Sequence, residues 1–169
     1  ASFASSYIPT TTAAVARNAD VLTYQFAGNA SATAGTAYAE VMVEHPGTLA
    51  TDTVAVAFSN ASSIGTLRAG NVANTVINIR DGTQTVSKSG LTDMQTAIRK
   101  RASAWGGSTM AITGDGATVA SGSFDGDLGS IAIAIGCDSA GGRTWFGTIK
   151  NVRIWTSQLP NGELQVITT

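Results

Sequence analysis

The tryptophans, and the polar residues near two of them, are the part of the sequence best suited to binding a ligand. Trp105 is followed by Gly-Gly-Ser, and Trp145 follows a glycine-rich stretch that contains Asp138 and Arg143. A sugar ring has an apolar C–H face and a rim of hydroxyls, so its sites combine an exposed aromatic ring with short polar groups. We therefore expect Trp105 and Trp145 to lie exposed in loops and to bind a glycan with Arg143 and Asp138. The alternative is that Trp105 or Trp145 packs over the end of the domain instead of binding a ligand. Trp155 lies inside an alternating segment, so we expect it in the core.

The residue types needed for catalysis do not form a recognisable set. His45 is the only histidine, and no serine or cysteine nucleophile signature lies near it, so we expect a structural role for it. Glycoside hydrolysis needs two carboxylates that flank the scissile bond. Glu40 and Glu44 share one face of an alternating segment, but Met42 lies between them and no third acid follows. We expect a solvated outer face here, and a protein that is not an enzyme.

A metal site has only weak candidates. Asp125 and Asp127 flank a glycine, and carboxylates in such a loop are possible calcium ligands, with Asp138 as an additional one. The full EF-hand pattern is missing, and paired aspartates around a glycine also occur in plain turns. We expect no cofactor, with calcium as the alternative. Cys137 is the only cysteine, so no intrachain disulfide forms and we expect a small buried residue.

Composition indicates one all-β domain. The chain has 169 residues, of which 43% are hydrophobic and only 12% charged, with 19 glycines. The formal net charge is -1, and basic residues are scattered apart from 99–101, which argues against nucleic-acid binding. No apolar run approaches the roughly 20 residues needed to cross a bilayer, so we expect no membrane insertion.

Period-two alternation predicts about ten short strands and no helix before the last residues. Asp81-Gly82 is the strongest hairpin signal and predicts a type I′ turn, and Gly114-Asp115-Gly116 predicts a second hairpin. Segment 91–102 also has helical spacing, but we interpret it as a strand. The predicted strands are 21–27, 36–45, 53–58, 75–80, 83–87, 91–102, 110–113, 117–120, 131–135 and 148–155.

The same alternation predicts which faces are buried. Small aliphatic residues along 39–43 should face the core, and the isoleucines of 131–135 should form a buried face. In 148–155 neither face is wholly apolar, which suits a strand whose outer side meets solvent or a ligand. One face carries Ile149, Asn151, Arg153 and Trp155.

The end of the sequence resembles a known family. Gly147, an alternating strand with Arg153-Ile154-Trp155, then Leu159 and Glu163-Leu164, is similar to the last strand and closing turn of laminin-G-like and other concanavalin A-like lectin domains. The resemblance implies an antiparallel two-sheet β-sandwich of the concanavalin A-like jelly-roll type, closed by one short helical turn. The number of strands predicted from alternation agrees with that fold.

The start of the sequence carries a second resemblance. Residues 6–11 (Ser-Tyr-Ile-Pro-Thr-Thr), followed by 14–20, are similar to a junction segment of phage tail-fibre and other virion-associated proteins. An ordinary Thr-rich linker is the alternative. Pro9 removes a ladder hydrogen bond, so we expect an extended N-terminal arm or linker over 1–20 and a lectin-like domain over 21–169.

These expectations combine into one functional hypothesis with two rivals. The chain is expected to be a non-catalytic module on a phage virion surface, in an extracellular setting, that binds a surface glycan. It is also expected to contact other virion proteins, and it is a possible homo-oligomer. The first rival is a structural decoration or spacer protein that binds capsid or tail subunits, and the second is a polysaccharide-active enzyme with this fold.

Overall fold

A computed structural model describes residues 22–44, 53–58, 64–69 and 75–169. These residues form eleven strands and one helix. The strands are β1 (Leu22–Tyr24), β2 (Gly35–Val43), β3 (Thr53–Ala57), β4 (Ile64–Ala69), β5 (Ile77–Asp81), β6 (Thr85–Lys88), β7 (Arg99–Gly106), β8 (Thr109–Gly114), β9 (Ala120–Ser123), β10 (Ile133–Ile135) and β11 (Gly147–Trp155), and the helix is α1 (Asn161–Ile167). The expected arm over 1–20 and His45 lie outside the described residues.

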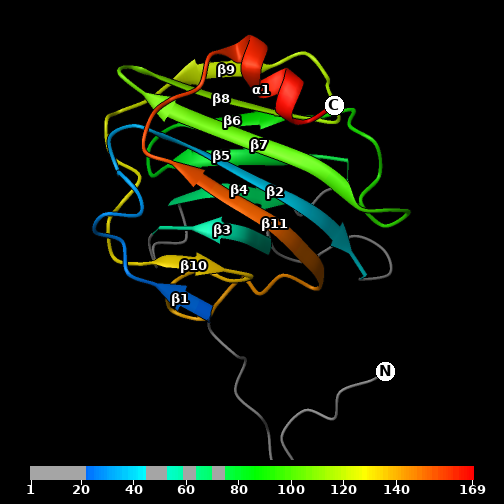
Figure 1. Cartoon of the computed structure of the whole chain (residues 1–169), viewed down its shortest axis with the longest axis horizontal. Helices are drawn as coiled ribbons and strands as arrows, with labels where there is room; N and C mark the ends of the chain where they lie inside the picture. The colour runs from blue at the N-terminus through cyan, green and yellow to red at the C-terminus, as the bar shows by residue number, and fades with distance from the viewer. Residues whose placement is uncertain (1–21, 45–52, 59–63, 70–74) are drawn as a thin grey trace, which may run out of the picture.

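The strands form two stacked antiparallel sheets. Sheet A has six strands in the order β1-β10-β3-β4-β5-β6, and sheet B has five in the order β11-β2-β7-β8-β9. Figure 1 shows sheet B in front of sheet A, with α1 on the outer side of sheet B near β8 and β9. The predicted all-β two-sheet sandwich is confirmed.

The main core fills the space between the sheets. The β2 residues Ala39, Val41 and Val43 are all buried in it, as their alternation predicts. The prediction for the isoleucines is wrong at one position and incomplete at another: Ile133 is 3% exposed, but Ile131 is 60% exposed and Ile135 is only half-buried. β10 begins at Ile133, so Ile131 precedes the strand, and its N–H bonds the carbonyl oxygen of Phe58 instead.

A β-bulge in β11 corrects the predicted faces of that strand. Lys150 pairs with Glu40 and Arg153 with Tyr38, so two residues of β11 oppose a single residue of β2. Asn151 has a φ of 52°, the left-handed conformation of a bulge residue. One inserted residue exchanges the faces of everything beyond it, because side chains alternate with period two. The aliphatic residues of β11 therefore all face inward against the main core: Ile149, Val152 and Ile154.

Both predicted hairpins form, but the second has a longer loop than predicted, because β9 begins at Ala120 and the expected strand over 117–120 is absent. The turn at Asp81-Gly82 differs from type I′. Arg80 pairs with Thr85, and the N–H of Asp81 bonds the carbonyl oxygen of Gln84, which places Gly82 first of the two central residues. Its φ of 111° fits the first position of a type II′ turn, where glycine is preferred. The Asp81 carboxylate accepts the N–H of Gln84 at 2.6 Å, so the side chain that suggested a central position instead closes the turn.

The segment predicted as one strand over 91–102 is a strand only in its last part. Asp93 Oδ1 accepts the N–H of Gln95 at 2.8 Å, a local turn that competes with a sheet ladder. β7 begins at Arg99 and continues to Gly106, and a two-residue turn at Gly107 and Ser108 joins it to β8. The sequence interpretation missed this hairpin.

The predicted closing helical turn is present as α1. Thr36 fixes the approach to it, since its hydroxyl donates to the carbonyl oxygen of Ser157 and accepts the N–H of Leu159, both at 2.9 Å. Leu164 of α1 is fully buried in a second, smaller core on the outer face of sheet B. That core also contains Tyr38, Ala102, Ala104 and Ala111. The helix thus covers the β7–β8 side of sheet B and leaves the β2–β11 side open.

Candidate functional site

Trp105, the first predicted glycan contact, lies in the core. Its side chain is 0% exposed, its indole N–H donates to the carbonyl oxygen of Ser31 at 3.1 Å, and its ring packs edge-on against Phe58. The expectation of an exposed loop tryptophan is wrong here, because β7 runs on to Gly106 and strand alternation points the indole inward. No face of this ring is open to a ligand.

Trp145 is also buried, at 7% exposure, and its indole N–H donates to the carbonyl oxygen of Met42 at 3.0 Å. Asp138 and Arg143 do lie in the loop before it. The Asp138 carboxylate is 6% exposed and accepts the N–H groups of Ala140 and Gly142, so it closes the loop. With its aromatic ring inside the core, this loop lacks the exposed stacking surface that was predicted.

The weak calcium candidates Asp125 and Asp127 both accept hydrogen bonds from within the protein. Asp125 accepts the N–H of Asp127 and the hydroxyl of Thr83, and Asp127 accepts the N–H of Gly129. Within the described ranges, no three acidic, histidine or cysteine side chains are grouped to hold a metal ion. The absence of a cofactor stays the prediction, with calcium as its alternative.

An open groove on the outer face of sheet B brings together the functional groups that sequence reasoning did not select. Its volume is about 250 Å³, and we call it the sheet B groove. Strands β2, β7 and β11 form its floor, and the end of α1 closes one side. Its lining residues are Tyr38, Glu40, Lys100, Arg153, Trp155 and Ile167.

The strand register sets these side chains in rows across the floor. Glu40 of β2 is paired with Lys150 of β11 on one side and with Lys100 of β7 on the other. The next row pairs Arg153 with Tyr38. On the β7 side small alanines follow, which leaves room for α1 to pack. The groove is therefore polar at one end and partly aromatic at the other.

Glu40 is the centre of a hydrogen-bonded network. Its Oε1 accepts the amide N–H of Asn151 at 2.9 Å and the hydroxyl of Tyr38 at 3.1 Å, and its Oε2 pairs with Lys150 Nζ at 3.4 Å. These contacts, led by the one from Asn151, hold the pKa of Glu40 below its ordinary value. Burial and the bond to Glu40 raise the pKa of Tyr38 to about 12, so its phenol is neutral at physiological pH. The sequence predicts Glu40 on a solvated outer face; the structure confirms the outer face, but the side chain is partly buried and hydrogen-bonded there.

Arg153 and Trp155 form the other half of the sheet B groove. The guanidinium of Arg153 lies 5.8 Å from the centre of the Tyr38 ring, a cation–π distance. Trp155 was predicted to be core, but it is half-buried: one part packs on the smaller core, and the rest lines the groove. The aromatic ring that lines the groove is thus Trp155, which alternation predicted to lie in the core.

The sequence contains the polar residues of this site, but strict alternation does not show that they share one face of the sheet. Lys150, Asn151 and Arg153 all reach the outer face because the bulge inserts one residue among them. Bulges recur next to functional sites, where they redirect side chains. A strict alternation rule places Lys150 and Arg153 on opposite faces, so it separates residues that the structure brings together.

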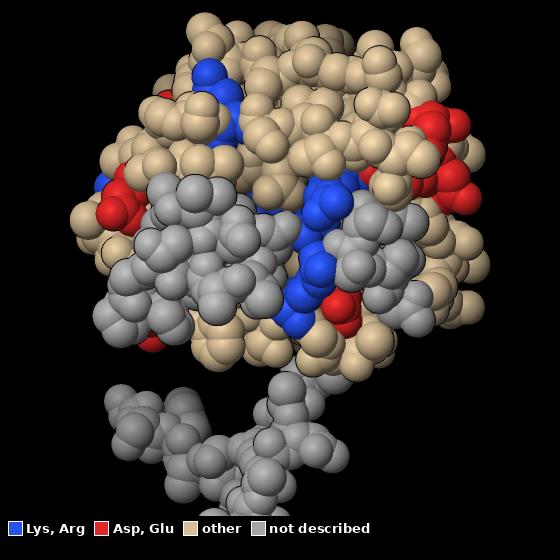
Figure 2. Space-filling view, turned by 180° about the vertical axis from the view of Figure 1, so that it is seen from behind, with Lys and Arg blue, Asp and Glu red and all other residues tan. Residues whose placement is uncertain are grey.

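The outer face of sheet A, seen in Figure 2, carries Lys and Arg side chains gathered in a column. Two arginines lie on its central strands, Arg68 on β4 and Arg80 on β5. Both are engaged in interactions within the protein, and Arg68 is 1% exposed. We therefore do not treat this face as a ligand site.

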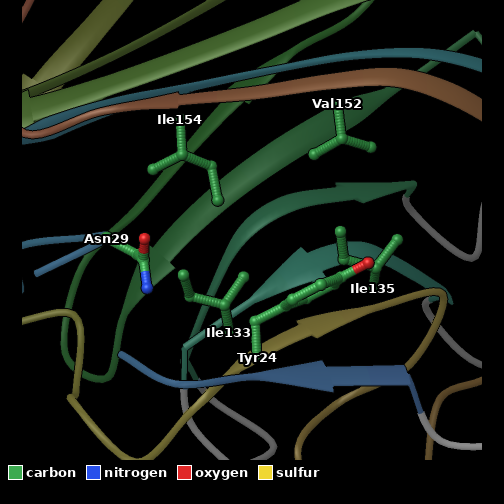
Figure 3. Close-up of a pocket in the computed structure, with 6 residues that line it drawn as sticks. All are labelled: Tyr24, Asn29, Ile133, Ile135, Val152 and Ile154. Atoms are coloured by element: carbon green, nitrogen blue, oxygen red, sulfur yellow. The ribbon is translucent and has the colours of Figure 1, made fainter. Parts of the chain in front are cut away.

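A second hollow, of about 350 Å³, opens between the sheets at the β1 and β11 edges. Figure 3 shows Val152 and Ile154 pointing from β11 toward Ile133 and Ile135 on β10. Asn29 also lines it, but its amide N–H donates to the carbonyl oxygen of Gln25. Tyr24 contributes an exposed phenol ring, and the other four lining residues are aliphatic and continue the core, so this hollow offers fewer polar groups than the sheet B groove.

Comparison with known proteins adds the fold context. No protein-family model and no curated protein sequence matches this chain. The structure is similar to the Ruminococcus gnavus IT-sialidase CBM40 bound to α2,3-sialyllactose, at a TM-score of 0.58 and 10% identity over 90% of this chain and 97% of that one. The two share a two-sheet β-sandwich fold.

Two further solved structures share the fold. Domain 4 of AbnA, an extracellular arabinanase from Geobacillus stearothermophilus in complex with arabinotriose, matches at a TM-score of 0.56 and 12% identity over 88% of this chain and 72% of that one. Tailspike protein 2 of Escherichia coli O157:H7 bacteriophage CAB120 matches at 0.55 and 18% identity, over 90% of this chain and 24% of the tailspike. Among the described residues, no helix has the length and apolar character to span a bilayer.

Proposed function

We propose that this chain is a glycan-binding module whose ligand occupies the sheet B groove. The observation that carries the proposal is the combination of the half-buried indole of Trp155 with Arg153 and the Tyr38–Glu40 pair in one open groove. Such a surface offers a ring for the C–H face of a sugar and polar groups for its hydroxyls. The structures bound to sialyllactose and arabinotriose support a sugar ligand for this fold.

The volume of the groove suggests that only a small part of a glycan binds in it. Its volume of about 250 Å³ lies below the roughly 300 Å³ at which sites for drug-sized ligands begin. We expect one terminal sugar to be held, with the remainder of the glycan in solvent.

The module is proposed to be non-catalytic. Glycoside hydrolysis uses a pair of carboxyl groups about 5–9.5 Å apart. Of the residues that line the sheet B groove, Glu40 is the only acid, and its oxygens are bonded to Tyr38, Asn151 and Lys150. A release assay for reducing ends on a polysaccharide panel tests this point, and turnover lost on Glu40→Gln would overturn it.

A place on a phage virion is the proposed setting. The resemblance of residues 6–20 to tail-fibre junction segments and the fold match to a tailspike support it. A structural spacer role, with other virion proteins as partners, is the competing proposal that the tailspike match also favours. Detection of this chain in purified virions by mass spectrometry tests the setting, and glycan binding separates the two roles.

The binding proposal is tested with a glycan array followed by calorimetry on the best ligand. We expect Trp155→Ala to weaken binding at least tenfold, which is about 1.4 kcal/mol. Phe146→Ala is the matched control, because that ring is 52% exposed but does not line the groove. Equal affinity of the parent protein, Trp155→Ala and Arg153→Ala would overturn the site assignment, and no binding on a broad array would overturn the function.

A further inference from the structure

We infer that the glycan bound in the sheet B groove is acidic, with a carboxylate that pairs with Arg153. The inference rests on the proposed function and adds the chemical class of the ligand. It comes from an imbalance in the groove: the acidic side chain is already hydrogen-bonded, while the guanidinium of Arg153 has neither an ion pair nor a hydrogen bond among the described residues.

Glu40 has less open hydrogen-bonding capacity for a ligand than Arg153 has. Both of its carboxylate oxygens are engaged, Oε1 by Asn151 and Tyr38 and Oε2 by Lys150. A sugar hydroxyl that donates to Glu40 would therefore compete with bonds already formed inside the protein. A ligand gains more from groups whose hydrogen-bonding capacity is still open.

The lysines beside Glu40 are partly committed as well. Lys150 pairs with Glu40, and Lys100 donates a hydrogen bond to the main-chain oxygen of Thr169. Arg153 differs from both. Its side chain is exposed, and across the part of the chain that the structure describes its guanidinium has a cation–π contact with Tyr38 but neither an ion pair nor a hydrogen bond.

The Tyr38 ring helps to orient this guanidinium. Tyr38 is 5% exposed and held by its bond to Glu40, so the cation rests on a fixed aromatic surface. Arginine presents its N–H donors in a planar fork that matches the two oxygens of a carboxylate. A pre-oriented fork loses less freedom when it binds, which favours a planar anion over a neutral hydroxyl.

The charge of the groove points the same way. Lys100 and Arg153 outnumber Glu40 among the lining residues, and Lys150 stands next to them on β11. A carboxylate therefore enters a region of net positive charge, whereas a neutral sugar leaves the guanidinium of Arg153 with water as its partner. Uronic acids and sialic acids are the sugars that carry this group.

The test uses matched pairs of ligands. Glycans that end in glucuronate, galacturonate or sialate are each compared with their methyl esters, which keep the shape and remove the charge, and a sulfated lactose represents a non-planar anion. We expect at least one acid to bind tenfold or more tighter than its ester and than the sulfated sugar. In Arg153→Gln that difference should vanish, because the affinity for the acid should fall to that for its ester.

Two variants make the result specific. Arg153→Lys keeps the charge but loses the fork, so it should retain only part of the preference for the acid. Lys88→Gln removes an equal charge from β6 of sheet A and should leave the preference intact. Equal binding of acids and esters by the parent protein would overturn the acidic ligand but keep glycan binding, whereas failure of every acidic and neutral glycan to bind would overturn the proposed function itself.

Discussion

At the residue scale, the tryptophans show what side-chain type alone can and cannot indicate. Aromatic rings near glycines and polar groups suggested Trp105 and Trp145, yet both indoles are buried and donate hydrogen bonds to main-chain oxygens. Trp155 has the least suggestive sequence context and lines the groove. The residue type does not distinguish a core tryptophan from one in a sugar site. Strand register and the area that α1 covers decide which of the three indoles is exposed.

These tryptophans should separate stability from binding. We expect Trp105→Ala to lower the free energy of unfolding by about 3–5 kcal/mol, because it leaves a cavity in the main core. Trp155→Ala should cost about 1 kcal/mol, since its ring is half-buried. Urea denaturation with equal m-values measures both changes, and a larger loss for Trp155→Ala would contradict the burial described here.

Tyr38 gives a pH prediction with a definite sign. Its pKa is raised from 10.0 to about 12, so the folded state favours the neutral phenol. The stability gained this way is fully present below pH 10.0 and is lost as the pH rises toward about 12. Stability measured against pH should therefore fall less steeply in this range for Tyr38→Phe than for the parent protein. Parallel curves would show that the phenol is not held neutral.

At the element scale, the bulge in β11 determines where the site forms. Alternation located the strand correctly, and it also identified the core face of β2. Alternation could not predict the face of Asn151, because the residue types do not reveal an inserted residue. The insertion is recognised only from the pairing of β11 with β2. The hairpin at Gly107 and Ser108 was missed for a related reason: two small residues served as the turn where a longer loop was expected.

Substitutions at Asn151 test the bulge. Asn151→Gly should keep the left-handed backbone and lose only the amide bond to Glu40. Asn151→Ala loses the same bond and adds a steric penalty of about 1–2 kcal/mol at this φ. Alanine should therefore be the less stable variant in denaturant titrations, and identical stabilities would indicate that the bulge is not held by this residue.

A buried ion pair joins the ends of β7 and β8. Arg101 is 0% exposed, and its Nη1 lies 2.6 Å from Oδ2 of Asp115. Removal of one partner leaves a buried charge uncompensated, which typically costs about 3–5 kcal/mol. Because Asp115 is 24% exposed, we expect Asp115→Asn to lie near the lower end of that range in thermal or urea unfolding. A loss below about 1 kcal/mol would mean that water replaces the carboxylate.

At the scale of the whole molecule, the fold was more predictable than the site. Strand count, turn signals and the resemblance of the last segment sufficed for a two-sheet sandwich, because both sheets must bury one apolar face. The sheet B groove depends on long-range facts that no local pattern contains: the pairing of β11 with β2, and the cover that α1 gives to only part of sheet B. A fold can be predicted correctly when the faces of a few residues are wrong, whereas the prediction of a site fails if one of its residues is placed on the wrong face.

The most direct test of the account follows the indole N–H signals of the three tryptophans by NMR during titration with α2,3-sialyllactose and the best ligand from the array. Binding in the sheet B groove should shift the Trp155 signal in proportion to occupancy. The signals of Trp105 and Trp145, whose N–H groups are bonded inside the core, should stay in place. A shift of the Trp145 signal with no change at Trp155 would contradict the claim that the glycan binds on the outer face of sheet B.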